Sequence, residues 1–134
     1  GDELKIVNDQ YGVPTWSRML AEVTSQILAQ SFSPLCRQAA PIQDVSGIYH
    51  AVSAGSTSWH GFAAKILESA AGLALPAAPK LVPIPTSGYP LPATRPRNSC
   101  LSNEKLMRTY GLTIPSWEES LALCLRDIPA APVT

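Results

Sequence analysis

The placement of proline most constrains what this chain can fold into. Thirteen of the 134 residues are proline, and they concentrate between residues 76 and 96 and near the C-terminal end. Proline lacks the backbone N–H that helix interiors and central strands require, so these two regions are expected to be connections or edge strands. Hydrophobic residues make up 46% of the sequence, which is enough for a folded core and argues against disorder throughout.

Charge and cysteine content exclude several classes of function. Ten basic residues balance ten acidic ones, so a single domain of this length has no net field to attract nucleic acid or an anionic membrane. The three cysteines contain no CxxC pair, which favours neither a disulfide framework nor a four-ligand zinc site. No apolar run approaches the roughly 18 residues that span a bilayer. These features favour a cytoplasmic location.

Periodic apolar residues predict an α/β fold with about four helices and short strands. The expected helices cover residues 16–30, 59–71, 102–110 and 116–128, and the expected strands cover residues 4–8, 47–53 and 80–85. Thr15 is a candidate N-cap for the first helix, and Ser116 with Glu119 forms a capping box for the last. Gly111 is placed to end the third helix.

Two of the expected strands have distinct characters. Residues 47–53 are rich in β-formers and apolar on both faces, which is typical of a strand covered on both sides in a larger sheet. Pro83 and Pro85 restrict residues 80–85 to the edge of a sheet. The tryptophans Trp16, Trp59 and Trp117 fall on helical stripes, so core packing is their expected role.

Most enzyme signatures are absent from the chain. It contains no glycine-rich nucleotide loop, no HExxH and no GxSxG. His50 and His60 have no acidic residue or cysteine clustered around them, so a structural role outweighs metal binding or base catalysis.

Two loops have the composition of a ligand site. Residues 9–15 offer an amide, a hydroxyl and backbone groups beside the start of a helix, and residues 94–99 offer two guanidinium groups and an amide in a rigid turn. Arginine can hold two phosphate oxygens at once, which fits a polar ligand that carries phosphate. From composition alone, a turn between domains with solvated arginines is favoured over a ligand site.

The two loops and their surroundings resemble one family in order over residues 4–128. This family is that of the dTDP-4-dehydrorhamnose reductases, which are extended short-chain dehydrogenases/reductases, and the resemblance is to their C-terminal part. The matching segments are residues 6–15, 47–50, 58–63, 89–90, 95–101 and 117–118.

The resemblance implies an N-terminal Rossmann half that binds NADPH and carries a Tyr-x-x-x-Lys pair. In the implied reaction, hydride from NADPH reduces C4 of dTDP-4-dehydro-L-rhamnose to give dTDP-L-rhamnose. No tyrosine of this chain has a lysine four residues later, so residues 1–128 are interpreted as the substrate-binding fragment, without the NADPH-binding half and inactive alone. Residues 129–134 are interpreted as a Pro/Ala-rich tail, and the full-length protein as a homodimer.

The resemblance assigns substrate-binding roles to seven residues of the two loops. They are Gln10, Gly12, Pro14, Thr15, Arg95, Asn98 and Ser99. Gly12 and Pro14 would shape the first loop, Gln10 and Thr15 would contact the thymidine portion, and Arg95 would contact the diphosphate, although Arg97 could take that place.

Two further readings stay open beside the reductase. Relatives in this superfamily include non-catalytic regulatory or binding modules, and the parent protein could reduce another nucleotide-linked deoxysugar. Some relatives bind magnesium through acidic residues at a dimer contact. In the helix expected after Thr15, this chain has Arg18 where an acidic residue would help to bind the metal, so no metal site is carried over.

Overall fold

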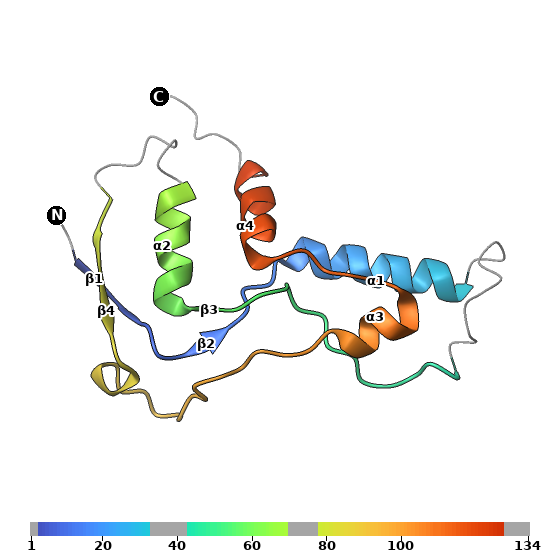
Figure 1. Cartoon of the computed structure of the whole chain (residues 1–134), viewed down its shortest axis with the longest axis horizontal. Helices are drawn as coiled ribbons and strands as arrows, with labels where there is room; N and C mark the ends of the chain where they lie inside the picture. Colours follow the sequence, from blue (N-terminus) through green and yellow to red (C-terminus); the bar gives the residue numbers. More distant parts are fainter. Residues whose placement is uncertain (1–2, 33–42, 70–77, 128–134) are drawn as a thin grey trace.

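A computed structural model describes residues 3–32, 43–69 and 78–127, and these ranges form four helices with short strands (Figure 1). The last two residues of the helix expected at 59–71 and the interpretation of residues 129–134 as a tail lie outside the described ranges. In chain order, the elements are β1 (Glu3–Val7), β2 (Tyr11–Gly12), α1 (Ser17–Phe32), β3 (Thr57–Ser58), α2 (Trp59–Ser69), β4 (Lys80–Ile84), the 3-10 turn η2 (Thr86–Gly88), α3 (Glu104–Tyr110) and α4 (Trp117–Arg126).

One end of the molecule is a parallel strand pair covered by a helix. β1 pairs with β4 in register from Glu3 opposite Lys80 to Val7 opposite Ile84, and α2 contacts both strands (Figure 1). Pro83 withholds one donor from β4, which is tolerated because the strand has a single neighbour among the described residues. The predicted edge position of this strand is therefore confirmed.

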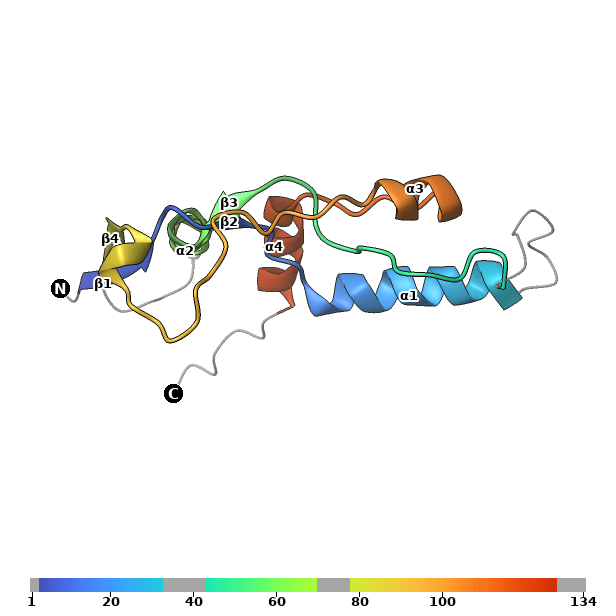
Figure 2. The same ribbon diagram turned by 90° about the horizontal axis from the view of Figure 1, so that it is seen from below.

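The other end holds the main hydrophobic core. Leu106 of α3 is 1% exposed and packs with Val23 of α1 and with Leu112 and Ile114 of the segment after α3. Both views show α1 and α3 lying side by side there (Figures 1 and 2). Gly111 ends α3 as predicted, with a φ of +66° and its N–H donating to the carbonyl of Met107.

α4 links the two ends. Its capping box is present as predicted, because Ser116 Oγ accepts from the Glu119 N–H and the Glu119 carboxylate accepts from the Ser116 N–H. Trp117 is buried, as expected from its helical stripe, and meets Phe62 of α2 edge to face at 5.9 Å between ring centroids. The start of α4 is thereby fixed against α2.

The predicted strand at 47–53 is wrong. These residues join no ladder, and side chains from distant segments satisfy part of their backbone. Asn103 accepts from the Val52 N–H at 3.0 Å and donates to the Val52 carbonyl at 2.6 Å, which imitates a neighbouring strand. The expected cover on both faces is also wrong, because Ile48 is 84% exposed and only Ser53 of this segment is buried.

Two local predictions also need correction. Thr15 does not cap α1, which begins at Ser17. Its hydroxyl instead accepts from the Ser53 N–H at 3.1 Å. Trp59 is 56% exposed instead of buried. It is the first residue of α2 and lies at the end of the helix's apolar stripe.

A backbone junction at Tyr11 joins three segments that are far apart in the sequence. Tyr11 pairs with Ser58 in the antiparallel β2–β3 contact. Its N–H donates to the Arg97 carbonyl at 2.8 Å, and its carbonyl accepts from the Ser99 N–H at 2.9 Å and the Ser99 hydroxyl at 3.1 Å. A Cβ on Gly12 would lie 2.8 Å from Ser99 Oγ, so a larger residue here would force the Ser99 side chain to move.

Leu106 should be a major source of stability. Leu106→Ala is expected to lower the free energy of unfolding by about 2 to 5 kcal/mol, because it leaves a cavity in the main core. Met107→Ala on the exposed side of the same helix is the matched control and should cost less than about 1 kcal/mol. Urea denaturation followed by circular dichroism measures both, and equal losses would contradict this assignment of the core.

Gly12→Ala should disturb the junction through Ser99. The added methyl group would displace the Ser99 hydroxyl from the Tyr11 carbonyl, at a cost of about 1 kcal/mol or more in unfolding free energy. In a double-mutant cycle, the same change should cost less in a Ser99→Ala background, which has no hydroxyl to displace. Additive losses in thermal and urea unfolding would show that the two residues are not coupled.

Candidate functional site

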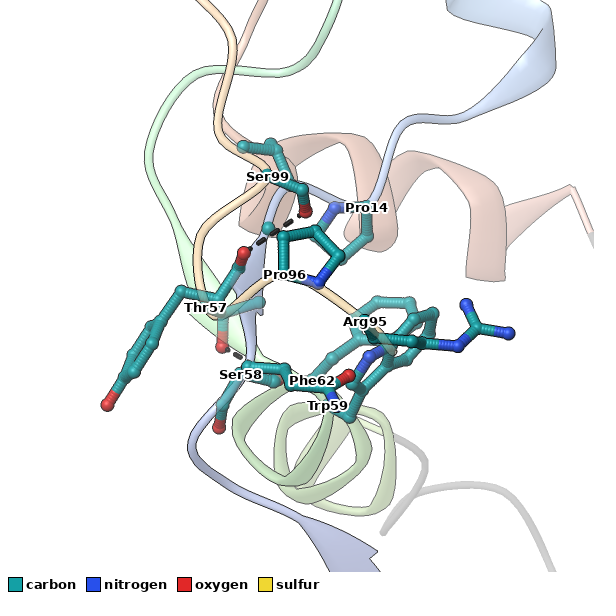
Figure 3. Close-up of a pocket in the computed structure, with 12 residues that line it drawn as sticks. Pro14, Thr57, Ser58, Trp59, Phe62, Arg95, Pro96 and Ser99 are labelled. Carbon is teal, nitrogen blue, oxygen red and sulfur yellow. Dashed lines mark hydrogen bonds between the residues drawn. The ribbon is translucent and has the colours of Figure 1, made fainter. Parts of the chain in front are cut away.

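The two candidate loops meet in one cavity of about 370 Å³. Figure 3 shows Pro14, Pro96 and Ser99 on one side of it, with Trp59 and Phe62, from the start of α2, on another. The full lining comprises Gln10, Tyr11, Gly12, Val13, Pro14, Thr57, Ser58, Trp59, Phe62, Arg95, Pro96 and Ser99. The Tyr11 junction thus holds the walls of the cavity together.

A second cavity of about 350 Å³ adjoins the first. It shares Gln10, Trp59 and Arg95 with the first cavity, and its other lining residues are Lys5, Ile6, Val7, Tyr89 and Leu91. The shared residues place one buried amide, one indole and one guanidinium between the two spaces. A ligand with a flat ring at one end and an anion at the other could extend across both.

The structure brings five of the seven predicted site residues into the lining of the first cavity: Gln10, Gly12, Pro14, Arg95 and Ser99. It leaves Thr15 and Asn98 outside. Thr15 Oγ1 is bonded to the backbone of Val13 and Ser53, and the Asn98 side chain accepts from the Cys100 N–H at 2.9 Å. Both residues therefore hold the loops in shape.

The two arginines of the second loop occupy different environments. Arg95 lines both cavities, whereas Arg97 lines neither. The contact that Arg97 makes is through its backbone, because its carbonyl accepts from the Tyr11 N–H in the junction. Between these two side chains, only Arg95 is placed to meet an anion in the cavity.

Gln10 belongs to a polar network at the carboxyl ends of β1 and β4. Gln10 Nε2 donates to Thr86 Oγ1 at 3.1 Å, and Asp9 Oδ1 accepts from the Thr86 hydroxyl at 2.6 Å and from the Thr86 N–H at 2.8 Å. The hydrogen bond from the Thr86 side chain is the main cause that lowers the pKa of the Asp9 carboxyl below its ordinary value. Ligands of open α/β sheets commonly bind beyond such strand ends.

Sequence reasoning missed the contribution of α2 and the strand before it. Thr57, Ser58 and Phe62 line the cavity although no site role was predicted for them, and Trp59 was assigned to the core. The available signal was the segment at 58–63, which belongs to the same family resemblance as the two loops. On its own pattern, this segment predicts only the start of the helix at 59–71.

The described ranges contain no group of three or more His, Cys, Asp or Glu side chains that could hold a metal ion. Arg18 Nη1 pairs with the carboxylate of Asp127, the residue that follows α4, at 2.5 Å. No helix within the same ranges is long and apolar enough to cross a membrane.

The pH dependence of stability should report the Asp9 network. Because the pKa of Asp9 is lowered on folding, its contribution is present above the ordinary value of 3.8 and is lost as the pH falls through the lower folded-state value. Asp9→Asn should therefore reduce the free energy of unfolding more at about pH 7 than at about pH 3. Urea unfolding at both values measures this, and an equal loss at both would contradict the role of the charge.

Comparison with known proteins identifies the family of the chain. Residues 1–129 match the family described as the RmlD substrate binding domain. A dTDP-4-dehydrorhamnose reductase of Burkholderia thailandensis is 48% identical over 130 residues, covering 95% of this chain and 42% of the relative. The reductase of Escherichia coli K12 is 37% identical over 128 residues, covering 95% of this chain and 40% of the relative.

Solved structures show the same relationship. The dTDP-4-dehydrorhamnose reductase of Bacillus anthracis, solved in complex with NADP, superposes with a TM-score of 0.76 at 28% identity, over 96% of this chain and 39% of that one. The Clostridium acetobutylicum protein gives 0.73 at 31% identity, over 95% and 40%. This chain thus spans about two-fifths of the length of these relatives. With the family match covering nearly every residue, the chain belongs to the RmlD substrate binding domain family.

Proposed function

We propose that this chain forms the nucleotide-sugar-binding part of a dTDP-4-dehydrorhamnose reductase. The observation that carries the proposal is the meeting of both loops in one cavity, where Arg95 and the buried Gln10 face the same space. The reductases that resemble this chain extend well beyond its span. Their remaining part would bind NADPH and supply the catalytic Tyr-x-x-x-Lys pair, so this chain alone is expected to be inactive.

The lining residues suit the parts of a dTDP-sugar. The guanidinium of Arg95 can form paired, charge-assisted hydrogen bonds with diphosphate oxygens. The exposed indole of Trp59 offers a flat apolar surface for a ring. Thr57, Ser58 and Ser99 add hydroxyl groups of the kind that bind sugars. Direct ligand contacts of Thr15 and Asn98 stay predictions, because their side chains are engaged in the loop backbone.

The chemistry proposed for the whole protein is the reduction of dTDP-4-dehydro-L-rhamnose to dTDP-L-rhamnose. The task of this chain is to fix the sugar nucleotide so that its C4 carbonyl faces the hydride donor, since alignment of the reacting atoms contributes much of the rate. The balanced charge of the chain supports a small-molecule ligand over a nucleic acid or a membrane. We place the full-length protein in the cytoplasm as a homodimer.

Arg95→Ala should weaken the binding of dTDP by about 1.5 to 3 kcal/mol, because it removes a charge-assisted hydrogen bond to the diphosphate. Arg97→Ala is the matched control. It removes the same charge two residues away, outside both cavities, and should leave the affinity nearly unchanged. Isothermal titration of the chain with dTDP, with dTMP and UDP for comparison, measures both effects.

Two results would contradict the proposal. Equal losses in the two arginine variants would indicate a general effect of charge instead of a contact by Arg95. Failure of the unaltered chain to bind dTDP in preference to UDP would argue against a preformed site for the thymidine nucleotide within these residues.

A further inference from the structure

The side chain of Gln10 is buried but has one hydrogen-bonding group unpaired. Gln10 is 8% exposed and lies in the wall shared by both cavities. Its Nε2 donates to Thr86 Oγ1, whereas no described residue donates to its carbonyl oxygen Oε1. A buried amide with one open acceptor is suited to a ligand.

The hydrogen bonds of Thr86 decide which end of the amide faces the cavity. A threonine hydroxyl has a single proton, and a carboxylate can only accept. Because the hydroxyl of Thr86 lies 2.6 Å from Asp9 Oδ1, it donates its hydrogen bond to the Asp9 carboxylate. Thr86 Oγ1 can then only accept from Gln10, and it must meet the NH₂ group. The carbonyl oxygen is consequently the end left for the ligand.

We propose that Thr86, held by Asp9, is a positioning residue that fixes the amide of Gln10 with its carbonyl oxygen toward the cavity, so that the site selects a ligand that donates a hydrogen bond there. This inference rests on the proposed function, which makes the donor the N3–H of thymine. Cytosine has an acceptor at that ring position and would leave two acceptors facing each other. Uracil has the same N3–H and would not be rejected by this device.

The surroundings of Gln10 favour a base over a sugar at this point. Trp59 and Tyr89 line the second cavity with Gln10, and both are more than half exposed. Base-on-aromatic stacking is a general means of binding the flat face of a nucleobase, while a hydrogen bond at its edge identifies it. Arg95 lines the same space and is available for the phosphates.

The test compares Thr86→Val with Thr86→Ser in the full 134-residue chain. Valine keeps the shape of threonine but cannot accept from Gln10, whereas serine retains the hydroxyl. The probes are dTDP and its N3-methyl derivative, which lacks the donor. The unaltered chain and the serine variant should prefer dTDP by about tenfold in Kd. In the valine variant this preference should shrink toward unity, since the freed amide can rotate.

A measurement without ligand separates this inference from the proposed function. In NMR spectra, the side-chain NH₂ protons of Gln10 should exchange with solvent about tenfold more slowly in the unaltered chain and in Thr86→Ser than in Thr86→Val. Equal exchange in all three would overturn the positioning role. Retention of the full preference for dTDP by the valine variant would also overturn it. If the exchange pattern is as expected but the unaltered chain does not bind dTDP, the positioning of Gln10 stands and the proposed function fails.

Discussion

The site depends on the backbone hydrogen bonds of one residue, Tyr11. Its N–H and carbonyl are both used by the segment at 97–99, and β2 is simultaneously paired with β3. These bonds join segments separated by more than forty residues in each case, which local propensity alone could not bring together. Because both groups are paired with backbone groups of the other segment, the cavity walls are fixed relative to one another before any ligand is present.

A second constraint comes from the direction of the two parallel strands, β1 and β4. β1 and β4 run in the same direction, so their carboxyl ends bring Asp9 and Thr86 to the same edge. There the strand pairing stops and backbone groups need other partners. The Asp9 carboxylate satisfies the Thr86 N–H and hydroxyl together. Thr86 in turn accepts from Gln10 Nε2, so the hydrogen bonds at these strand ends also hold the side chain of Gln10 in place.

The features that could be predicted from the sequence are those decided within a few residues. The capping box at Ser116, the glycine end of α3 and the edge character of β4 each follow from local stereochemistry, and all three are present. The strand predicted at 47–53 failed because its hydrogen bonds come from Asn103 and Thr15, far along the chain. No local pattern distinguishes an extended segment paired by side chains from one paired by a strand.

The site could be predicted only in part, because its arrangement also depends on contacts between segments that are far apart in the sequence. The residue types of the two loops indicated a phosphate-bearing ligand, and the family resemblance selected positions within them. Neither could show that Arg95 lines the cavity whereas Arg97 does not, because that difference depends on how the segment at 97–99 pairs with Tyr11.

Trp59 shows how a folding signal and a binding signal can share one residue. Its position on the apolar stripe of α2 predicts burial, and the residues that follow it on the stripe, such as Phe62, are partly buried. Trp59 is the first residue of α2, and the segments that partly bury the later residues of the stripe leave it exposed. It lines both cavities together with Gln10 and Arg95. An indole left uncovered beside a buried amide and a guanidinium costs the fold apolar burial, and a ring-bearing anion placed across the two cavities would cover it.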